Sequence, residues 1–395
     1  MARVVALSGR VVLNSGQSAS RAWLVDGRLT LREPAGAGSA GSGGAGSAGS
    51  GGASAPAAEL TGWFYPGLVD VHCHIGLGSE GPVARETAVT QARADLAAGT
   101  LLVRDAGAQA DTHFLDGRGD VPLIIRAGQH VARPKRYLRH LAVELDEAAD
   151  LPEEVARQAR AGDGWVKIVA DWIDRSQGQE AVVASLWEPE VLADAVAAAH
   201  EAGARMTAHA FSTEAIGPLL EAGIDCIEHG SGMLEEHISE AAARGVAVTP
   251  TLVQSANFAE FAAAGQAKFP AYAAQMRWLY ERRFALLAQL VDAGVQILPG
   301  SDAGGTLRHG TLPDELALWA EAGLSAGDIM DFATWRARAY LASGPGAGAV
   351  QAGATGLIDG AMADFVHYEQ DPAQLLAAGA LTPTTVVRAG DHSGA

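Results

Sequence analysis

A regular alternation of apolar strands and alanine-rich helical segments between residues 68 and 301 is the feature that most constrains the fold. We expect strands at residues 68–74, 100–105, 122–127, 165–170, 204–209, 226–229, 246–252 and 295–301. Helical segments lie between most of them, at residues 85–98, 152–161, 190–202, 213–222, 234–244 and 272–293. Several of these helices are followed by a glycine, as at Gly223 and Gly245, which is a common helix stop. The pattern predicts an α/β protein with a (β/α)8 TIM-type barrel.

An open, doubly wound parallel sheet is the alternative arrangement of the same elements. The sequence favours it less, because no glycine-rich dinucleotide-binding turn follows the first strand. Short apolar runs also precede and follow the alternation, and the Asp26-Gly27 pair between two of them is typical of a hairpin. We therefore expect a small composite β-sandwich domain built from the N- and C-terminal segments.

The expected domain boundaries follow from this division. Residues 1–66 would form the N-terminal part of the β domain, residues 67–345 the barrel, and residues 346–395 the C-terminal part of the β domain. Residues 34–57 consist mainly of glycine, alanine and serine, so we predict a flexible linker there.

Composition excludes several classes of partner. The chain has 28 basic and 46 acidic residues, a formal net charge of −18, which disfavours nucleic acid and anionic membranes as general partners. No apolar run is long enough to span a bilayer, and the N-terminus lacks the pattern of a signal peptide. We expect a cytoplasmic protein whose two cysteines, Cys73 and Cys226, are free buried thiols.

A His-x-His pair ends the first expected strand. Side chains alternate along a strand, so His72 and His74 project to the same side as Asp70. Neutral imidazole is a common metal ligand, but two histidines alone do not complete a site of three or four ligands. The pair therefore predicts half of a metal site.

Other ligand-type residues lie at the ends of later strands. Because the carboxyl ends of barrel strands meet at one face, we expect these residues to converge with the pair; they are Lys167, His209, His229 and Asp302. Lys167 lies within an apolar strand, where an unpaired ammonium is costly. Either CO2 converts the amine to a carbamate that bridges two metal ions, or the lysine forms a salt bridge, for instance with Asp171 or Asp174.

This set of residues resembles the metal signature of the amidohydrolase superfamily, and the resemblance covers nearly the whole chain. The segments 66–70, 227–230, 300–304 and 360–366 are similar to the branch that holds imidazolonepropionase and the metal-dependent Xaa-Pro dipeptidases and arginine carboxypeptidases. The Val166-Lys167-Ile168 run resembles the dipeptidase-like members, whose lysine is carboxylated.

The resemblance implies a binuclear zinc site. His72, His74 and Asp302 would hold the more buried ion, His209 and His229 the second, and a CO2-derived carbamate on Lys167 would bridge them. A metal-activated hydroxide would then attack a substrate carbonyl, while Asp302 carries the proton of the water to the leaving nitrogen. The expected reaction is hydrolysis of an amide-type C–N bond.

The substrate is less constrained than the metal site. We expect contacts from the loop after the third strand, where His130 matches a histidine that lies near the substrate carbonyl in relatives. Arg126, Arg133 and Tyr137 are further candidates, because arginine suits a carboxylate, although a solvated basic loop explains these residues equally well. We expect a small-molecule amide substrate, peptide-like or an N-acyl amino acid, and a homo-oligomer.

Two other functions stay open. A mononuclear cyclic amidohydrolase or deaminase of imidazolonepropionase type would need only one metal ion. A non-catalytic metal-binding or scaffold barrel belongs to a different class of protein, and the full set of ligand-type residues argues against it.

Overall fold

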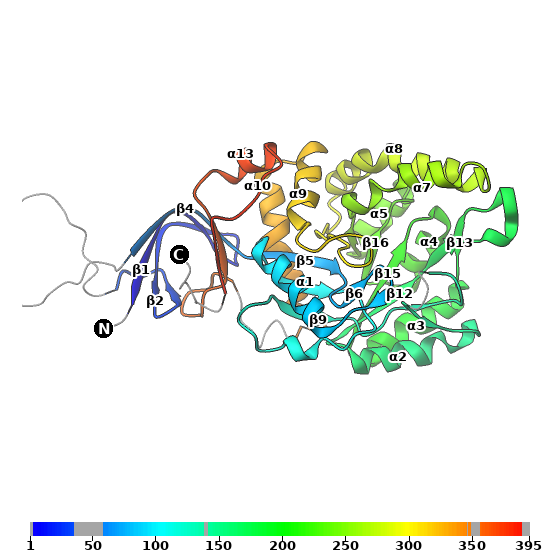
Figure 1. Ribbon diagram of the computed structural model, residues 1–395, viewed down its shortest axis with the longest axis horizontal. Helices are drawn as coiled ribbons and strands as arrows, with labels where there is room; N and C mark the ends of the chain where they lie inside the picture. The colour runs from blue at the N-terminus through cyan, green and yellow to red at the C-terminus, as the bar shows by residue number, and fades with distance from the viewer. Residues whose placement is uncertain (1–2, 35–57, 138–140, 346, 349–355, 389–395) are drawn as a thin grey trace, which may run out of the picture.

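The computed structural model describes residues 3–34, 58–137, 141–345, 347–348 and 356–388. A β-sheet unit lies at one end of the molecule and a larger α/β unit at the other (Figure 1). The predicted linker at 34–57 falls, apart from Pro34, outside the described residues.

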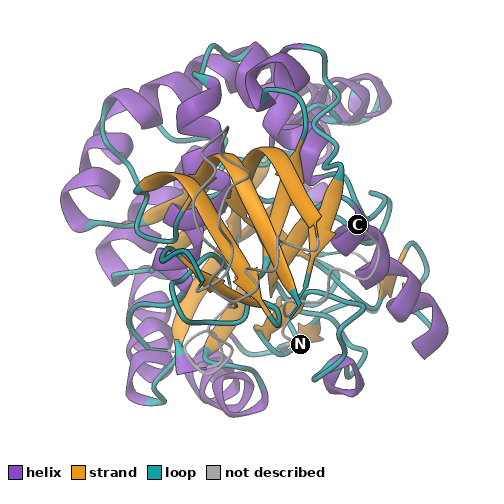
Figure 2. Ribbon diagram, turned by 90° about the vertical axis from the view of Figure 1, so that its left-hand side faces the viewer, coloured by secondary structure: helices purple, strands orange, loops and turns teal. Residues whose placement is uncertain are grey.

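The β-sheet unit combines strands from both ends of the chain. Its six strands follow the order β19-β18-β4-β1-β2-β3, and the sheet is strongly curved (Figures 1 and 2). The strands are β1 (Val4–Val12), β2 (Ser18–Val25), β3 (Arg28–Thr30), β4 (Ala58–Pro66), β18 (Phe365–Tyr368) and β19 (Thr385–Val387). The predicted β-sandwich is therefore corrected to a single sheet within the described residues. Its curvature lets one face enclose a small apolar core of its own, which includes Leu7, Leu24 and Phe365.

Two parallel sheets form the centre of the larger unit. One has the order β5-β8-β9 and the other β11-β10-β12-β15-β16-β17, and every pairing within them is parallel. The strands are β5 (Leu68–Cys73), β8 (Thr100–Asp105), β9 (Leu123–Arg126), β10 (Val131–Ala132), β11 (Val143–Glu144), β12 (Trp165–Val169), β15 (Arg205–Ala210), β16 (Cys226–His229) and β17 (Ala247–Thr249). Short antiparallel pairs join β6 (Leu77–Gly78) to β7 (Gly81–Pro82) and β13 (Asp171–Ile173) to β14 (Val183–Ser185).

Helices surround these sheets (Figure 2). They are α1 (Arg85–Ala97), α2 (Leu151–Ala161), α3 (Pro189–Glu201), α4 (Thr213–Ala222), α5 (Glu235–Arg244), α6 (Leu252–Ser255), α7 (Phe258–Gly265), α8 (Pro270–Asp292), α9 (Leu312–Glu321), α10 (Ala326–Asp331), α11 (Ala337–Leu341) and α13 (Pro372–Ala377). The helix stops predicted at Gly223 and Gly245 are confirmed, since both glycines end their helices in the left-handed conformation. No helix in the described ranges is long and apolar enough to cross a membrane.

The expected closed eight-stranded barrel is not seen in the described residues. Between β9 and β12 the ring is interrupted, because Asp163 takes up the hydrogen bonds of the last β9 residue: its carboxylate accepts from Arg126 N at 3.0 Å, and its own N donates to Arg126 O at 2.8 Å. The strand expected at 295–301 is reduced to one isolated bridge, Val248 to Ile297, and a second bridge, Cys73 to Ala303, lies just beyond it. Pro299 lies in that segment and has no N–H to donate to a strand ladder.

Candidate active site

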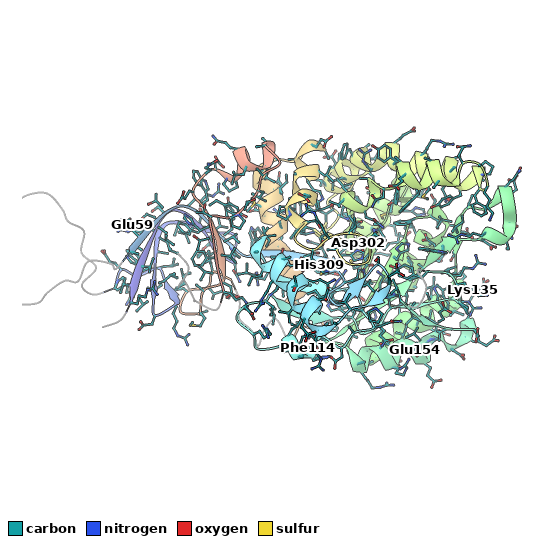
Figure 3. All side chains as sticks on the ribbon, in the orientation of Figure 1. Glu59, Phe114, Lys135, Glu154, Asp302 and His309 are labelled. Atoms are coloured by element: carbon teal, nitrogen blue, oxygen red, sulfur yellow. The ribbon has the colours of Figure 1, made fainter. Side chains whose placement is uncertain are left out.

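Ligand-type side chains converge at one end of the parallel strands. His72 and His74 come from the end of β5, Lys167 from β12, His209 from β15 and His229 from the end of β16. Asp302 follows the 295–301 segment and lies well inside the larger unit (Figure 3). The histidine rings lie close together: the centroids of His72 and His229 are 5.1 Å apart, and those of His209 and His229 are 4.8 Å apart.

Two histidines and one carboxylate form the tightest group. Oδ1 of Asp302 lies 3.1 Å from His72 Nε2 and 3.4 Å from His74 Nε2. Burial alone would raise the pKa of Asp302, but the adjacent His72 and His74 lower it well below its usual value. The three candidate ligand atoms lie within 4.8 Å of one another, and nitrogen and carboxylate donors of this kind suit a zinc-like divalent cation.

Hydrogen bonds from outside the ligand group determine which ring nitrogen of His74 and of His229 faces the other candidate ligands. Nδ1 of His74 lies 2.7 Å from Gly107 O, which only accepts, so Nδ1 carries a proton and Nε2 is the nitrogen that faces Asp302. Burial alone would lower the pKa of His74, but the adjacent Asp302 carboxylate raises it above its usual value. Nδ1 of His229 lies 2.5 Å from Thr251 Oγ1, whose hydroxyl already donates to Pro250 O at 2.8 Å. His229 Nδ1 is therefore also a donor, and its Nε2 is left as the ligand nitrogen.

His72, His209 and His229 are held in the neutral form. Burial, and then the charge of Lys167, lower the pKa of His209 to about 3, and burial lowers the pKa values of His72 and His229 as well. A neutral imidazole keeps a lone pair for a metal ion. Nε2 of His209 has no hydrogen-bond partner in the described structure and lies 3.5 Å from Oδ1 of Asp171. These donors fit the expected divalent ions.

Lys167 is paired with a residue that the sequence analysis missed. Its Nζ forms an ion pair with Oε2 of Glu228, rather than with Asp171 or Asp174 as expected for a salt-bridged lysine. Glu228 is fully buried, and its Oε1 accepts from Arg104 Nη2 at 3.2 Å. An acid inside the apolar β16 strand was as unusual as the lysine in β12, and that signal could have identified Glu228.

The backbone is strained at this end of the strands. His229, Thr251 and Asp302 have φ values of 65°, 47° and 53°, in the left-handed region that residues other than glycine rarely adopt. Such conformations persist where the surrounding contacts enforce them, and they occur often at functional sites. Close packing adds a second constraint, since a Cβ atom on Gly300 would lie 2.7 Å from the Cβ of His72.

An aromatic wall adjoins the ligand group. Tyr137 lies between His130 and Trp172, with ring centroids 4.9 Å and 5.2 Å away. Both ring nitrogens of His130 are buried without a hydrogen-bond partner in the described ranges, and burial lowers its pKa well below the usual value. His130 and Tyr137 therefore lie beside the ligand group, with ring centroids 6.0 Å from His74 and 5.9 Å from His209, respectively.

A cavity of about 1010 Å³ opens beside this wall. Tyr137 and Trp172 line it, together with three basic and two acidic residues: Lys135, Arg136, Arg175, Glu144 and Asp174. Lys135 lies on the side of the larger unit that faces away from the β-sheet unit (Figure 3). The cavity wall therefore combines aromatic rings with charged side chains of both signs, the basic ones in excess.

Comparison with known proteins identifies the family. A sequence model described as "Amidohydrolase family" matches residues 63–375. The chain belongs to the amidohydrolase family. Uncharacterized proteins of Mycobacterium tuberculosis and Mycobacterium bovis are 43% identical to this amidohydrolase over 373 residues, which cover 94% of this chain and 92% of theirs.

Solved structures share the fold at lower identity. A Xaa-Pro dipeptidase with bound methionine matches with a TM-score of 0.72 and 19% identity, over 98% of both chains. A prolidase complexed with N-methylphosphonate-L-proline matches with a TM-score of 0.72 and 22% identity, again over 98% of both chains. The ochratoxinase of A. niger matches with a TM-score of 0.73 and 18% identity, over 98% of this chain and 95% of that one. The superfamily predicted from the sequence is confirmed, and membership supports hydrolytic cleavage of C–N bonds as the reaction class.

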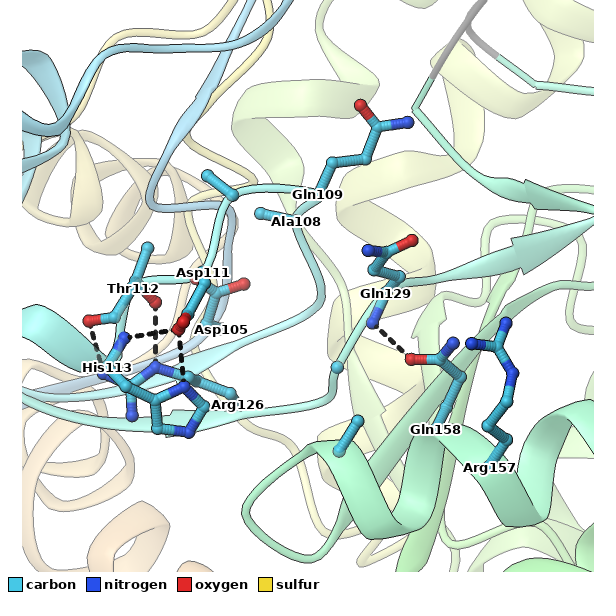
Figure 4. A pocket seen from close by; sticks show the side chains of 13 residues that line it. Asp105, Ala108, Gln109, Asp111, Thr112, His113, Arg126, Gln129, Arg157 and Gln158 are labelled. Atoms are coloured by element: carbon cyan, nitrogen blue, oxygen red, sulfur yellow. Dashed lines mark hydrogen bonds and ion pairs between the residues drawn. The ribbon is translucent and has the colours of Figure 1, made fainter.

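The structure does not bring two of the predicted substrate contacts to the cavity of this amidohydrolase. The guanidinium of Arg126 is held by Asp116 at 2.7 Å and Asp163 at 3.0 Å. It also donates to Thr112 in a second cavity, of about 300 Å³ (Figure 4). Arg133 donates to Leu145 O at 2.8 Å. Both arginines already have local acceptors, which their sequence positions did not reveal.

Proposed function

We propose that this amidohydrolase is a metal-dependent enzyme that hydrolyses an amide-type C–N bond in a peptide-like or N-acyl amino acid substrate. One observation supports the proposal above all. Six ligand-type side chains converge beside one cavity, with His72, His209 and His229 neutral and Asp302 ionised. Such a donor set binds divalent cations such as zinc.

The proposed site holds two zinc ions. His72, His74 and Asp302 would hold one, His209 and His229 the other, and a carbamate on Lys167 would connect them. When bound, the ions supply an acidified water and an electrophile for the substrate carbonyl. The carbamate forms when the lone pair of the neutral amine bonds to the carbon of CO2, one C–O π pair moves to oxygen, and one N–H proton leaves to solvent.

The chain's own residues supply proton transfer and orientation. The ionised Oδ1 of Asp302 can accept a proton from the attacking water and return it to the leaving nitrogen. Neutral His130 has two unpaired ring nitrogens and can donate to the substrate carbonyl oxygen. Tyr137 and Trp172 place aromatic surface on the same side of the site, where an apolar part of the substrate can pack.

The cavity favours a substrate with an apolar part and a carboxylate. Trp172 and Tyr137 offer aromatic surface, and Lys135 and Arg175 carry exposed cationic groups at the cavity wall. Arg136 is partly neutralised, because its Nη2 lies 2.8 Å from Oδ1 of Asp174. We propose that the two exposed cations attract the carboxylate.

A mononuclear cyclic amidohydrolase or deaminase is the second candidate. The observation that favours it is the ion pair between Lys167 and Glu228, which satisfies the lysine without a carbamate. In that case one ion at His72, His74 and Asp302 would be enough. Counting metal ions per chain separates the two candidates: about two ions support the binuclear site, and about one supports the alternative.

Substitution of Asp302 tests the proposed chemistry. A library of dipeptides, N-acyl amino acids and cyclic amides is first screened with zinc-loaded protein for release of an amine. With the best substrate, Asp302→Asn should lower kcat by at least about 100-fold, because an amide cannot accept the proton of the water. Circular dichroism should report an intact fold. The exposed Asp194→Asn serves as the matched control and should keep full activity; full activity in Asp302→Asn would refute the mechanism.

A further inference from the structure

A buried chain of charges runs behind the ligand group. Arg104 on β8, Glu228 on β16 and Lys167 on β12 are each at most 1% exposed. Oε1 of Glu228 accepts from Arg104 Nη2 at 3.2 Å and from Thr207 Oγ1 at 2.9 Å. Its other oxygen, Oε2, pairs with Lys167 Nζ. Glu228 therefore links side chains of β8 and β15 to the amine on β12.

The two carboxylate oxygens of Glu228 contact different partners. Oε1 is fixed by two donors on the side away from the ligands. Oε2 is shared between Lys167 and the ligand group, since it lies 3.5 Å from Nε2 of His72. Arg104 is itself anchored, because its Nε donates to Val71 O at 2.7 Å and its guanidinium stacks over Trp165. The carboxylate is thus held in one orientation, with Oε2 directed at Lys167.

A carbamate would need this acceptor. Carboxylation leaves one N–H on Lys167, and a buried donor without a partner costs about 1–3 kcal/mol. Oε2 of Glu228 already lies at hydrogen-bonding range of that nitrogen. Arg104 balances the charge of Glu228 once Lys167 no longer carries a positive charge.

We propose that Glu228, held by Arg104 and Thr207, is the positioning residue for Lys167: it pairs with the free amine and then accepts the remaining N–H of the carbamate. The carbamate oxygens are thereby directed at the two metal positions. This inference rests on the proposed binuclear function. It predicts that the second metal ion depends on Glu228, although Glu228 is not one of the proposed ligands.

Glu228→Gln is a sharp test because the new side chain has the same shape. Arg104 and Thr207 donate to one terminal atom of residue 228, so the amide oxygen should turn toward them. The amide NH2 then faces Lys167, and the acceptor for the carbamate N–H is lost. We expect apparent affinity for the second ion to fall about 10- to 100-fold, as is typical when an outer partner of a metal ligand is removed.

The measurements are metal content per chain and the 13C NMR signal of the carbamate after exchange with labelled bicarbonate. Wild-type protein should carry about two ions and the signal, whereas Glu228→Gln should keep about one ion and lose the signal. Glu228→Leu should behave in the same way. Glu154→Gln is the matched control, because Glu154 is also buried and accepts from Arg157 and Gln158, but on α2.

The outcomes separate this inference from the function on which it rests. If Glu228→Gln and Glu228→Leu keep the carbamate signal and both ions, the role of Glu228 is refuted while the binuclear function stands. If wild-type protein itself shows one ion and no carbamate, the binuclear site is refuted and the inference falls with it. Thermal melting of each variant shows whether a loss reflects unfolding, and an unfolded Glu228→Leu leaves the decision to the isosteric Glu228→Gln.

Discussion

The orientation of individual ligand-type side chains depends on residues that contact them but are not themselves proposed ligands. Gly107 O fixes the tautomer of His74, and Thr251 fixes that of His229. Neither partner could be predicted from the sequence, because each contact joins separate strand ends. The proximity of His72, His74 and Asp302 could be predicted, since each follows an expected strand and the carboxyl ends of such strands meet at one face.

Thr251→Val tests whether a single hydroxyl orients the ring of His229. Valine keeps the shape but removes the acceptor of His229 Nδ1–H, so the imidazole can adopt the other tautomer and turn away. We expect zinc affinity at the His209 and His229 position to fall about 10- to 100-fold, measured by competition with a chelator. The exposed Thr90→Val on α1, whose hydroxyl donates to Glu86 O, is the control. Unchanged affinity would show that the hydroxyl does not orient the ring.

Elements were predicted better than the connections between them. The expected helix at 213–222 matches α4, and the expected strand at 100–105 matches β8, because local apolar patterns determine both. The last strand was wrong, since Pro299 and the turn at Asp302 prevent a continuous ladder. Closure between β9 and β12 failed because Asp163, 37 positions from Arg126, takes the place of a strand edge. A contact between residues so far apart leaves no periodic pattern in the sequence.

Glu315 joins two helices and should make stability depend on pH. Its carboxylate on α9 accepts from the N–H groups of Leu252 and Val253 at the start of α6. Burial raises the pKa of Glu315 from 4.5 to about 7 despite these hydrogen bonds. Below pH 4.5 the carboxyl of Glu315 is protonated in both the folded and the unfolded chain. Between pH 4.5 and 7 it is ionised in the unfolded chain but still protonated in the folded one, so the free energy of unfolding falls. Above pH 7 both are ionised and this loss of stability stays constant. Glu315 therefore lowers stability as pH rises through this range.

Glu315→Gln removes this dependence, because glutamine does not titrate. The variant loses hydrogen bonds at every pH, but relative to wild type it should gain up to about 3 kcal/mol in free energy of unfolding between pH 4.5 and pH 8. Urea unfolding at several pH values measures the difference. Parallel stability profiles for the two proteins would contradict the raised pKa.

The whole molecule is built from two units that share one continuous stretch of chain. β4 of the β-sheet unit ends at Pro66, and β5, which carries His72, begins at Leu68. Gly67 is therefore the only residue between the sheet and the first strand of the site. Arg338 on α11 donates to Gly67 O at 3.0 Å, which fixes this junction from the side of the larger unit. Contacts at the junction should couple the stability of both units.

Gly67→Ala tests that coupling. A Cβ atom at position 67 would lie 2.5 Å from the Cβ of Leu101 on β8, so β5 and β8 would have to move apart. Overpacking of this kind costs about 1–3 kcal/mol, and we expect the melting temperature to fall accordingly. Gly119→Ala is the control, because a Cβ atom there meets nothing within 4 Å. If the units are coupled, tryptophan fluorescence and bound zinc should be lost in one shifted transition; two separate transitions would show that the β-sheet unit does not support the site.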